Sequence, residues 1–264
     1  MRYTDAPRRR EELLRRLRAT GYVSAPKVAA ELNVSEMTIR RDLRLMADDG
    51  LAVRVTGGAR LPDGAGVPFE VRTDHSGAEK AAVARAAVAL LDPGATVALD
   101  SGTTVSRLAE ILPAGITVVT HSVPVIAACA ERDDIQLIGL GGIYHTGTRS
   151  FSGATVHAAL DDIAVDVAVL SATAVDPDGA YCADPYDADT KRALASVART
   201  VVVAADGSKF EARAPIRFRG AEGISAVVTD ERAPDDTLAA LDAAGVRIVR
   251  APSTNAADVA SEPS

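Results

Sequence analysis

The chain contains no tryptophan, and its five tyrosines and four phenylalanines make up only 3% of its 264 residues. Hydrophobic residues nevertheless account for 47% of the sequence. This combination describes a soluble globular protein rich in alanine and valine, and the length is sufficient for two domains.

Long apolar runs and metal-binding cysteine motifs are also missing. No stretch approaches the roughly 20 apolar residues of a membrane span, and the basic N-terminus lacks the apolar core of a secretory signal. Cys129 and Cys182 do not have metal-ligand spacing, and isolated cysteines of this kind are most often reduced. We therefore expect a cytoplasmic protein with no membrane partner, no metal and no cofactor.

Charge is distributed unevenly along the chain. The net charge is -7, but residues 1–60 hold 13 Lys and Arg against 8 Asp and Glu, which is +5. The remainder holds 16 against 28, which is -12. Such asymmetry indicates a nucleic-acid-binding segment at the N-terminal end and a different role for the acidic remainder.

The segment from Ser35 to Asp49 has the pattern of a capped helix. Ser35 is a good N-cap, and Glu36 places negative charge at the positive end of the helix dipole. Ile39, Leu43 and Met46 recur at helical spacing and predict an inward stripe. Polar and basic residues then face outward or sideways, namely Thr38, Arg40, Arg41 and Arg44.

Two further helices are predicted before this one, at Arg8–Thr20 and Ala25–Leu32, with a turn at Asn33-Val34. Helix, short helix, turn and capped helix is the helix-turn-helix order, in which the last helix enters the major groove of DNA. Gly50 ends that helix, and the alternation over 51–60 predicts a hairpin, the wing, that carries Arg54 and Arg60.

The predicted DNA contacts divide into two kinds. We expect Thr38 and Arg41 to contact base edges, and Arg40, Arg44 and Arg54 to contact phosphates. The full predicted set is Ser35, Glu36, Thr38, Arg40, Arg41, Arg44 and Arg54. Alternatively, an arginine-rich helix face is merely solvated.

Beyond residue 60 the pattern changes. Residues 61–78 are predicted to be a linker, because 61–68 is rich in glycine and proline. Residues 79–250 alternate short apolar strands with helices, which predicts a doubly wound, mostly parallel α/β domain. Residues 251–264 are polar and without pattern, and we expect a disordered tail.

A ligand site is predicted at the carboxyl ends of these strands, where such sheets bind ligands. The segment Asp100-Ser-Gly-Thr-Thr104 follows a strand and opens a helix, an arrangement that can hold a phosphate. Other strand ends carry further polar groups. The predicted set is Asp100, Ser101, Gly102, Thr103, Thr104, Thr120, His121, Ser122, Gly141, Gly142, Asp184, Asp187, Lys191, Asp206 and Lys209.

Several of these residues also have a purely structural interpretation. The Asp100–Thr104 segment can be a simple strand-to-helix turn with a hydroxyl cap. Asp187 and Lys191 are four apart on a predicted helix and can form a surface ion pair. Lys209 can be a solvated lysine, and His121 can act as a base or as a hydrogen-bonding group.

These motifs resemble those of the DeoR family of bacterial repressors. The N-terminal resemblance lies in Val34–Leu43, followed by Gly50-Leu51 and a Thr-Gly-Gly-Ala wing. The C-terminal resemblance lies in Asp-Ser-Gly-Thr-Thr, Thr-x-Ser, Leu-Gly-Gly and Ala-Asp-x-Ser-Lys-Phe elements. The resemblance implies a fold similar to sugar-phosphate isomerases and a phosphorylated sugar as inducer. The family usually has asparagine at the position of His121 and often has histidine at the position of Gly207.

Three functions remain open from the sequence. The first is a transcriptional repressor of sugar metabolism, a homodimer or tetramer that leaves its operator DNA when a phosphosugar binds. The second is a phosphosugar isomerase-like enzyme that uses Asp184 or Asp187 as base and Lys191 or Lys209 as electrostatic partner. The third is an architectural DNA-binding protein. The resemblance favours the repressor, which is not an enzyme.

Overall fold

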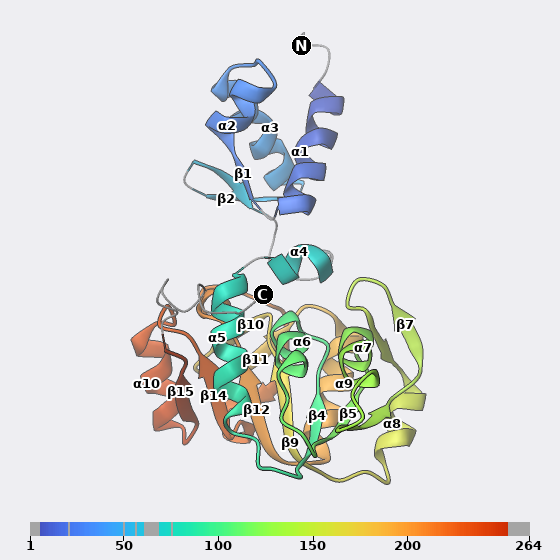
Figure 1. The fold of residues 1–264 in the computed structure, drawn as a ribbon. Helices are drawn as coiled ribbons and strands as arrows, with labels where there is room; N and C mark the ends of the chain where they lie inside the picture. The colour runs from blue at the N-terminus through green and yellow to red at the C-terminus, as the bar shows by residue number, and fades with distance from the viewer. Residues whose placement is uncertain are drawn as a thin grey trace, which may run out of the picture. The chain divides into compact units, whose positions relative to one another are not determined.

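The computed structural model describes residues 6–20, 22–49, 51–55, 57–60, 69–74 and 76–252 (Figure 1). The chain divides into two units, Met1–His75 and Ser76–Ser264. The described part of the expected linker contains helix α4, Phe69–Asp74. The tail predicted to be disordered lies outside the described residues from position 253 onward.

The first unit is a winged helix-turn-helix. It consists of α1 (Ala6–Thr20), β1 (Tyr22–Ser24), α2 (Ala25–Glu31), α3 (Glu36–Asp48), β2 (Val53–Val55) and β3 (Gly58–Arg60), followed by α4. The three predicted helices and the predicted hairpin are all present. Strand β1 is an addition, since it pairs with β3 and makes the wing a three-stranded antiparallel sheet in the order β1-β3-β2.

Aliphatic residues at helical spacing hold this unit together. Leu13 and Leu17 of α1 pack with Ile39, Leu43 and Met46 of α3, and all five are buried. Fully burying each such side chain contributes about 1.5–3 kcal/mol. The inward stripe predicted for α3 is therefore confirmed.

The second unit is built on one seven-stranded sheet in which every pair of neighbours is parallel. The strand order is β15-β14-β12-β9-β4-β5-β6. The bounds are β4 (Thr96–Leu99), β5 (Thr117–Thr120), β6 (Gln136–Gly139), β9 (Val165–Ser171), β12 (Ala198–Ala204), β14 (Ala226–Thr229) and β15 (Arg247–Arg250). The predicted alternation of short apolar strands and helices is present, and the doubly wound prediction is confirmed.

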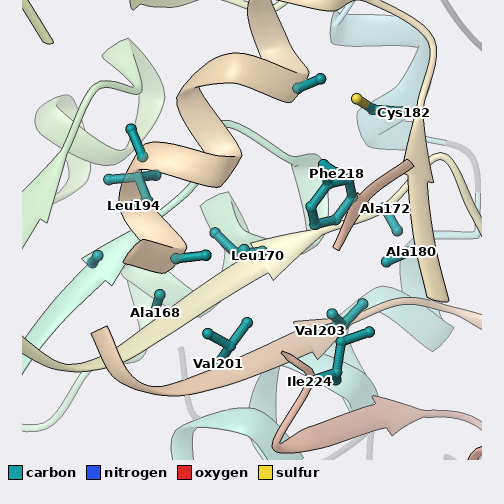
Figure 2. Packing of buried hydrophobic residues seen from close by; sticks show 14 of the residues in the cluster. Ala168, Leu170, Ala172, Ala180, Cys182, Leu194, Val201, Val203, Phe218 and Ile224 are labelled. Carbon is teal, nitrogen blue, oxygen red and sulfur yellow. The ribbon is translucent and has the colours of Figure 1, made fainter. Parts of the chain in front are cut away.

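Helices cover both faces of this sheet. They are α5 (Gly77–Val88), α6 (Thr103–Glu110), α7 (Val123–Ala130), α8 (Ala154–Leu160), α9 (Pro185–Ser196) and α10 (Asp235–Ala243). Alternate residues of each strand belong to different cores: Val97 and Leu99 pack with α5, α6 and α7, whereas Ala98 packs with α8 and α9. Figure 2 shows part of the second core, including Leu170 of β9 and Leu194 of α9.

Smaller elements surround the sheet and were not predicted. β7 (Ile143–His145) and β8 (Ser150–Ser152) form an antiparallel hairpin, and β10 (Ala174–Asp176), β11 (Gly179–Cys182) and β13 (Ile216–Gly220) form a three-stranded antiparallel sheet. Two 3-10 helices, η2 (Gly207–Phe210) and η3 (Ala221–Gly223), complete the unit. No helix among the described residues combines the length and the apolar character that crossing a membrane requires.

The strand order defines a switch point. From β4 the chain moves outward through β5 and β6, whereas from β9 it moves to the opposite edge through β12, β14 and β15. β4 and β9 are therefore the neighbours between which the winding reverses. Open α/β sheets bind ligands in the crevice outside the carboxyl ends of such a pair.

Candidate functional site

Helix α3 begins with the predicted cap. Ser35 Oγ accepts a hydrogen bond from Thr38 N at 3.2 Å and lies 2.8 Å from Thr38 Oγ1. A serine cap of this kind contributes about 1 kcal/mol to helix stability. The hydroxyl of Thr38, predicted to contact a base, is thus hydrogen-bonded within the protein.

The arginines of α3 differ in their surroundings. Arg40 Nε donates to Glu36 Oε1 at 2.8 Å, and Arg40 Nη2 lies 2.6 Å from the same oxygen. Arg41 and Arg44 are exposed, and Arg54 is exposed on wing strand β2. Because Glu36 already occupies the guanidinium of Arg40, a DNA phosphate must displace this carboxylate to bind Arg40 in full.

The inward face of α3 also holds a charge that the hydrophobic pattern did not predict. Asp42 is 3% exposed and forms an ion pair with Arg9 of α1, which is also buried. Asp42 lies three residues after Ile39 and four before Met46, so its spacing marks it as inward-facing. The pair connects α1 to α3.

In the second unit, polar residues follow the strands in sheet order at the switch point. Asp206 follows β12, Ser171 ends β9, Asp100 follows β4 and His121 follows β5. Asp206, Asp100 and His121 are buried, and Ser171 is half-buried. Helix α9, which carries Asp187 and Lys191, supplies a second set of groups to the same place.

Asp100 is the centre of this cluster. Its Oδ2 accepts hydrogen bonds from Ser171 N at 2.9 Å, from Ser171 Oγ at 2.5 Å and from Lys191 Nζ. Lys191 Nζ also lies 3.2 Å from Ser171 Oγ and 3.4 Å from Asp187 Oδ1. The side chains of Asp100 and Lys191 are 0% and 2% exposed, so the surface ion pair considered for Asp187 and Lys191 is instead part of a buried network.

The charges in this network shift one another's pKa values. Burial by itself disfavours the charged form of Asp100, but the Lys191 ammonium and the His121 ring outweigh it and hold the pKa of Asp100 well below its usual range. Burial likewise opposes the charge of Lys191, yet Asp100 and Asp187 raise the pKa of Lys191 to about 12. Asp100 and Lys191 are therefore a stable ion pair at neutral pH.

Asp187 behaves differently from Asp100. Burial raises the pKa of Asp187, and the negative charge of Asp100 raises it further against the opposing effect of Lys191. Asp187 is thus the carboxyl group of the cluster that takes up a proton most readily. A carboxyl group of this kind, next to a lysine, can serve either proton transfer or hydrogen bonding to a ligand hydroxyl.

His121 is held by the hairpin beside it. Its Nδ1 lies 2.8 Å from the carbonyl oxygen of Phe151 in β8, and a carbonyl oxygen only accepts, so Nδ1 carries the proton. Nε2 faces Asp100 Oδ1 at 3.5 Å. Neither of these two buried atoms has a hydrogen-bond partner among the described residues.

The loop after β4 packs tightly on β9. A Cβ on Gly102 would lie 2.1 Å from both Cβ and Oγ of Ser171, so glycine is required there by space. Ser101 is buried, and Thr103 and Thr104 are buried in the first turn of α6. Backbone N–H groups and hydroxyls at a helix start suit an anionic group.

Other predicted site residues have visible structural roles. Thr120 Oγ1 donates to Leu99 O at 2.7 Å, Ser122 Oγ caps α7 by accepting from Val125 N, and Asp184 Oδ1 caps α9 by accepting from Tyr186 N at 2.8 Å. Asp206 Oδ1 accepts from Ser208, while its buried Oδ2 lacks a hydrogen-bond partner in the described part of the chain.

The remaining predictions lie around the cluster. Gly141 and Gly142 are exposed, and a Cβ on Gly142 would lie 2.5 Å from Ser152 O. Lys209 is half-buried in η2. Gly207 packs against the next loop, because a Cβ there would lie 2.7 Å from Arg232 Cβ. The close approach leaves no room for a side chain such as histidine.

Sequence reasoning missed two residues of the cluster, Ser171 and Phe151. Ser171 is the first polar residue after the apolar run of β9, a signal that the sequence does contain. Phe151 contributes only its backbone oxygen. Within the described ranges, no group of three or more His, Cys, Asp or Glu is placed to hold a metal ion, and Cys129 and Cys182 are both buried free thiols.

A winged helix-turn-helix joined to a parallel α/β unit with a polar cluster at its switch point defines a DNA-binding transcriptional regulator with a sensor domain. Residues 9–65 match the DeoR-like helix-turn-helix domain, and residues 75–231 match the DeoR C-terminal sensor domain. The chain belongs to the DeoR family of transcriptional regulators.

Curated relatives extend over nearly the whole chain. A protein of Escherichia coli O157:H7, provisionally named as the aga operon transcriptional repressor, is 32% identical over 94% of this chain and 95% of its own. The glycerol-3-phosphate regulon repressor of E. coli K12 is 28% identical over 88% and 94%. The L-fucose operon activator of the same strain is 31% identical over 78% and 87%.

Solved structures resemble part of the chain. A D-ribose-5-phosphate isomerase in complex with phospho-erythronic acid aligns with 50% of this chain and 52% of its own, at 20% identity and a TM-score of 0.38. A likeness of this size carries no information about activity.

Proposed function

We propose that this regulator represses genes of sugar metabolism and that a phosphorylated sugar, bound in the second unit, lowers its affinity for operator DNA. The buried cluster of Asp100, Ser171, Lys191, Asp187 and His121 at the switch point carries this proposal, because several charged groups converge where such sheets bind polar ligands. The names of two relatives, a glycerol-3-phosphate regulon repressor and an aga operon repressor, are consistent with it.

In this proposal the site has an anion-binding side and a hydroxyl-binding side. The first turn of α6, with Ser101, Gly102, Thr103 and Thr104, faces the phosphate group. Carboxylates bind sugar hydroxyls, which are hydrogen-bond donors. Asp187 and Asp206 supply such carboxylates, and His121 supplies Nε2 as a further acceptor because its Nδ1 carries the proton. The polar strand ends after β5, β6 and β12 complete the effector site.

The first unit binds operator DNA in this proposal, with α3 in the major groove and the wing on the phosphate backbone. Helix-turn-helix proteins pair two such units on a two-fold operator, so we propose a homodimer or a tetramer. One relative is an activator, and the sign of regulation depends on where the operator lies. Repression is the proposal here because the family resemblance favours it.

Fluorescence anisotropy tests this proposal. The full-length protein is titrated onto its own upstream DNA at one salt concentration, and a panel of sugar phosphates is compared with the same sugars without phosphate. Release of DNA by one phosphate alone supports the proposal. DNA binding that no phosphate changes contradicts the sensor role.

A pair of variants locates the effect in the second unit. Thr103→Val with Thr104→Val removes two buried hydroxyls of the first turn of α6, and we expect normal DNA binding without release. Ser106→Ala is the control, because its hydroxyl donates to Gly102 O at 3.1 Å one turn later in the same helix. This control protein is expected to respond to the phosphate as the wild type does.

Catalysis is the second candidate, and the raised pKa of Asp187 next to Lys191 is the observation that favours it. We propose that the chain is not an enzyme, because Lys191 is already neutralised by Asp100 and all its relatives named above are regulators. Conversion of a pentose phosphate by the purified protein, lost in Asp187→Asn, would overturn this.

A further inference from the structure

Met37 is the most exposed large hydrophobic residue of the described chain, with 74% of its surface accessible. It is the second residue of α3. The buried residues of this helix, Ile39, Asp42, Leu43 and Met46, define its inward face. At about 100° per residue, Met37, Arg41 and Arg44 lie together on the opposite face.

The polar side chains next to Met37 bind one another on its two flanks. On one flank, Ser35 Oγ and Thr38 Oγ1 are 2.8 Å apart. On the other, Arg40 Nε donates to Glu36 Oε1 at 2.8 Å. The outward centre of the first turn is therefore an apolar thioether chain between two internally bonded pairs.

We propose that Met37 is a base-specificity residue that contacts the 5-methyl group of a thymine in the operator. The proposal rests on the DNA-binding role of the first unit. Residues in the first turns of a recognition helix meet base edges, and the thymine methyl is the apolar feature of the major groove. Methionine is flexible and polarizable, so it fits such a methyl without a fixed geometry.

The charges around Met37 bring it to that position. Arg44 shares its face, and a phosphate contact by such an arginine helps to hold a recognition helix in the groove. Arg41, on the same face, is the arginine expected at a base edge beside it. Leu45 is also an exposed apolar residue of α3, at 41%, but it lies two turns further along the helix. It therefore serves as a matched control that should not contact the same base.

The experiment uses deoxyuridine, which differs from thymidine only by the missing methyl group. The full-length protein is first used to select its preferred duplex from random DNA. Each thymine of the selected duplex is then replaced singly by deoxyuridine. The Kd of each duplex is measured at one salt concentration for wild type, Met37→Ala, Met37→Leu and Leu45→Ala.

We expect at least one thymine whose replacement weakens wild-type binding by about fourfold, the value for one buried methyl group. Met37→Ala should weaken binding to the thymine duplex and lose sensitivity at that position. Met37→Leu and Leu45→Ala should keep it. Because Met37 is exposed, unfolding is not expected, and a thermal melt checks this.

Two results would overturn the proposal. One is that no thymine is sensitive to loss of its methyl group. The other is that Met37→Ala keeps the full deoxyuridine effect. Either result leaves DNA binding itself intact, so it is distinguishable from failure of the regulator function, in which the wild-type protein would not select a sequence at all.

Discussion

Lys191 donates to Asp100 Oδ2 from a position 91 residues further along the chain, and neither side chain is reached appreciably by solvent. Two buried charges are compatible with folding only as a pair, because an unpaired buried charge costs several kcal/mol. Together with Ser171 they connect helix α9 to the ends of β4 and β9.

Removing one partner of this pair is expected to be costly. Lys191→Met leaves Asp100 without its main counter-charge, and we expect the second unit to lose about 3–5 kcal/mol of unfolding free energy. Lys191→Met combined with Asp100→Asn should recover most of that loss, because neither charge remains. Urea denaturation of Lys191→Met, Asp100→Asn and the double variant measures both effects, and simple addition of the two single losses would contradict the pairing.

The raised pKa of Asp187 predicts a pH dependence of stability. The folded protein keeps the Asp187 proton to higher pH than the unfolded chain, in which the pKa of Asp187 is 3.8. The contribution of this proton binding to stability is therefore complete below the unfolded pKa and is lost as the pH rises through the folded pKa. Asp187→Asn should therefore gain stability relative to wild type as pH rises from about 4 towards 8.

Urea unfolding at several pH values measures this difference. Asp242→Asn on α10 is the control, because Asp242 is exposed. Its stability should follow that of wild type over the same range. The pH dependence that Asp100 contributes has the opposite sign. Because its pKa is lowered in the folded protein, its contribution to stability is complete above about pH 4 and decreases as the pH falls. A loss of stability of Asp187→Asn relative to wild type with rising pH would refute the assignment.

Gly102 tests the packing of the loop after β4 on β9. Gly102→Ala would place a methyl group 2.1 Å from the Ser171 side chain, and such overpacking costs about 1–3 kcal/mol. Adding Ser171→Gly should restore part of the stability by removing the clash, although it also removes a hydrogen bond to Asp100. If the double variant is no more stable than Gly102→Ala, the close approach is not the cause.

Substitutions of different arginines in the first unit should affect DNA affinity in different ways. Arg41→Ala is expected to weaken binding to the selected operator by about 1–3 kcal/mol with little effect on random DNA. Arg54→Ala should weaken both alike and lower the slope of affinity against salt. Arg15→Ala removes the same charge from the exposed side of α1. It should change neither the preference for operator over random DNA nor the slope of affinity against salt by a comparable amount.

Much of the fold could be predicted because its helices show their own periodicity and its parallel strands stand out as short apolar runs between them. The sequence predicts strands at Thr96–Leu99 and Thr117–Thr120 and a helix at Ala154–Leu160, and β4, β5 and α8 have these bounds. β1 has only three residues, too few for an alternation, and it exists because β3 is available to pair with it. The β10–β11–β13 sheet likewise depends on pairing between distant segments.

The candidate site was predicted less completely, for a related reason. Asp100, His121, Asp187 and Lys191 were all expected at one crevice, and the structure brings them together. Ser171 was missed because the sequence does not reveal that β9 lies next to β4. The spacing of Asp42 places it on the inward face of α3, but the Arg9–Asp42 pair was missed because only tertiary packing shows that Arg9 lies against it.

The pairing of β4 with β9 also affects how the chain can fold during its synthesis. The core of the first unit is complete by Ala59, so it can close while most of the protein is still to be made. The central strands of the second unit join residues such as Asp100 and Ser171, 71 positions apart, and must wait for the later segment. A nascent chain would thus have a folded DNA-binding unit before it could respond to a metabolite.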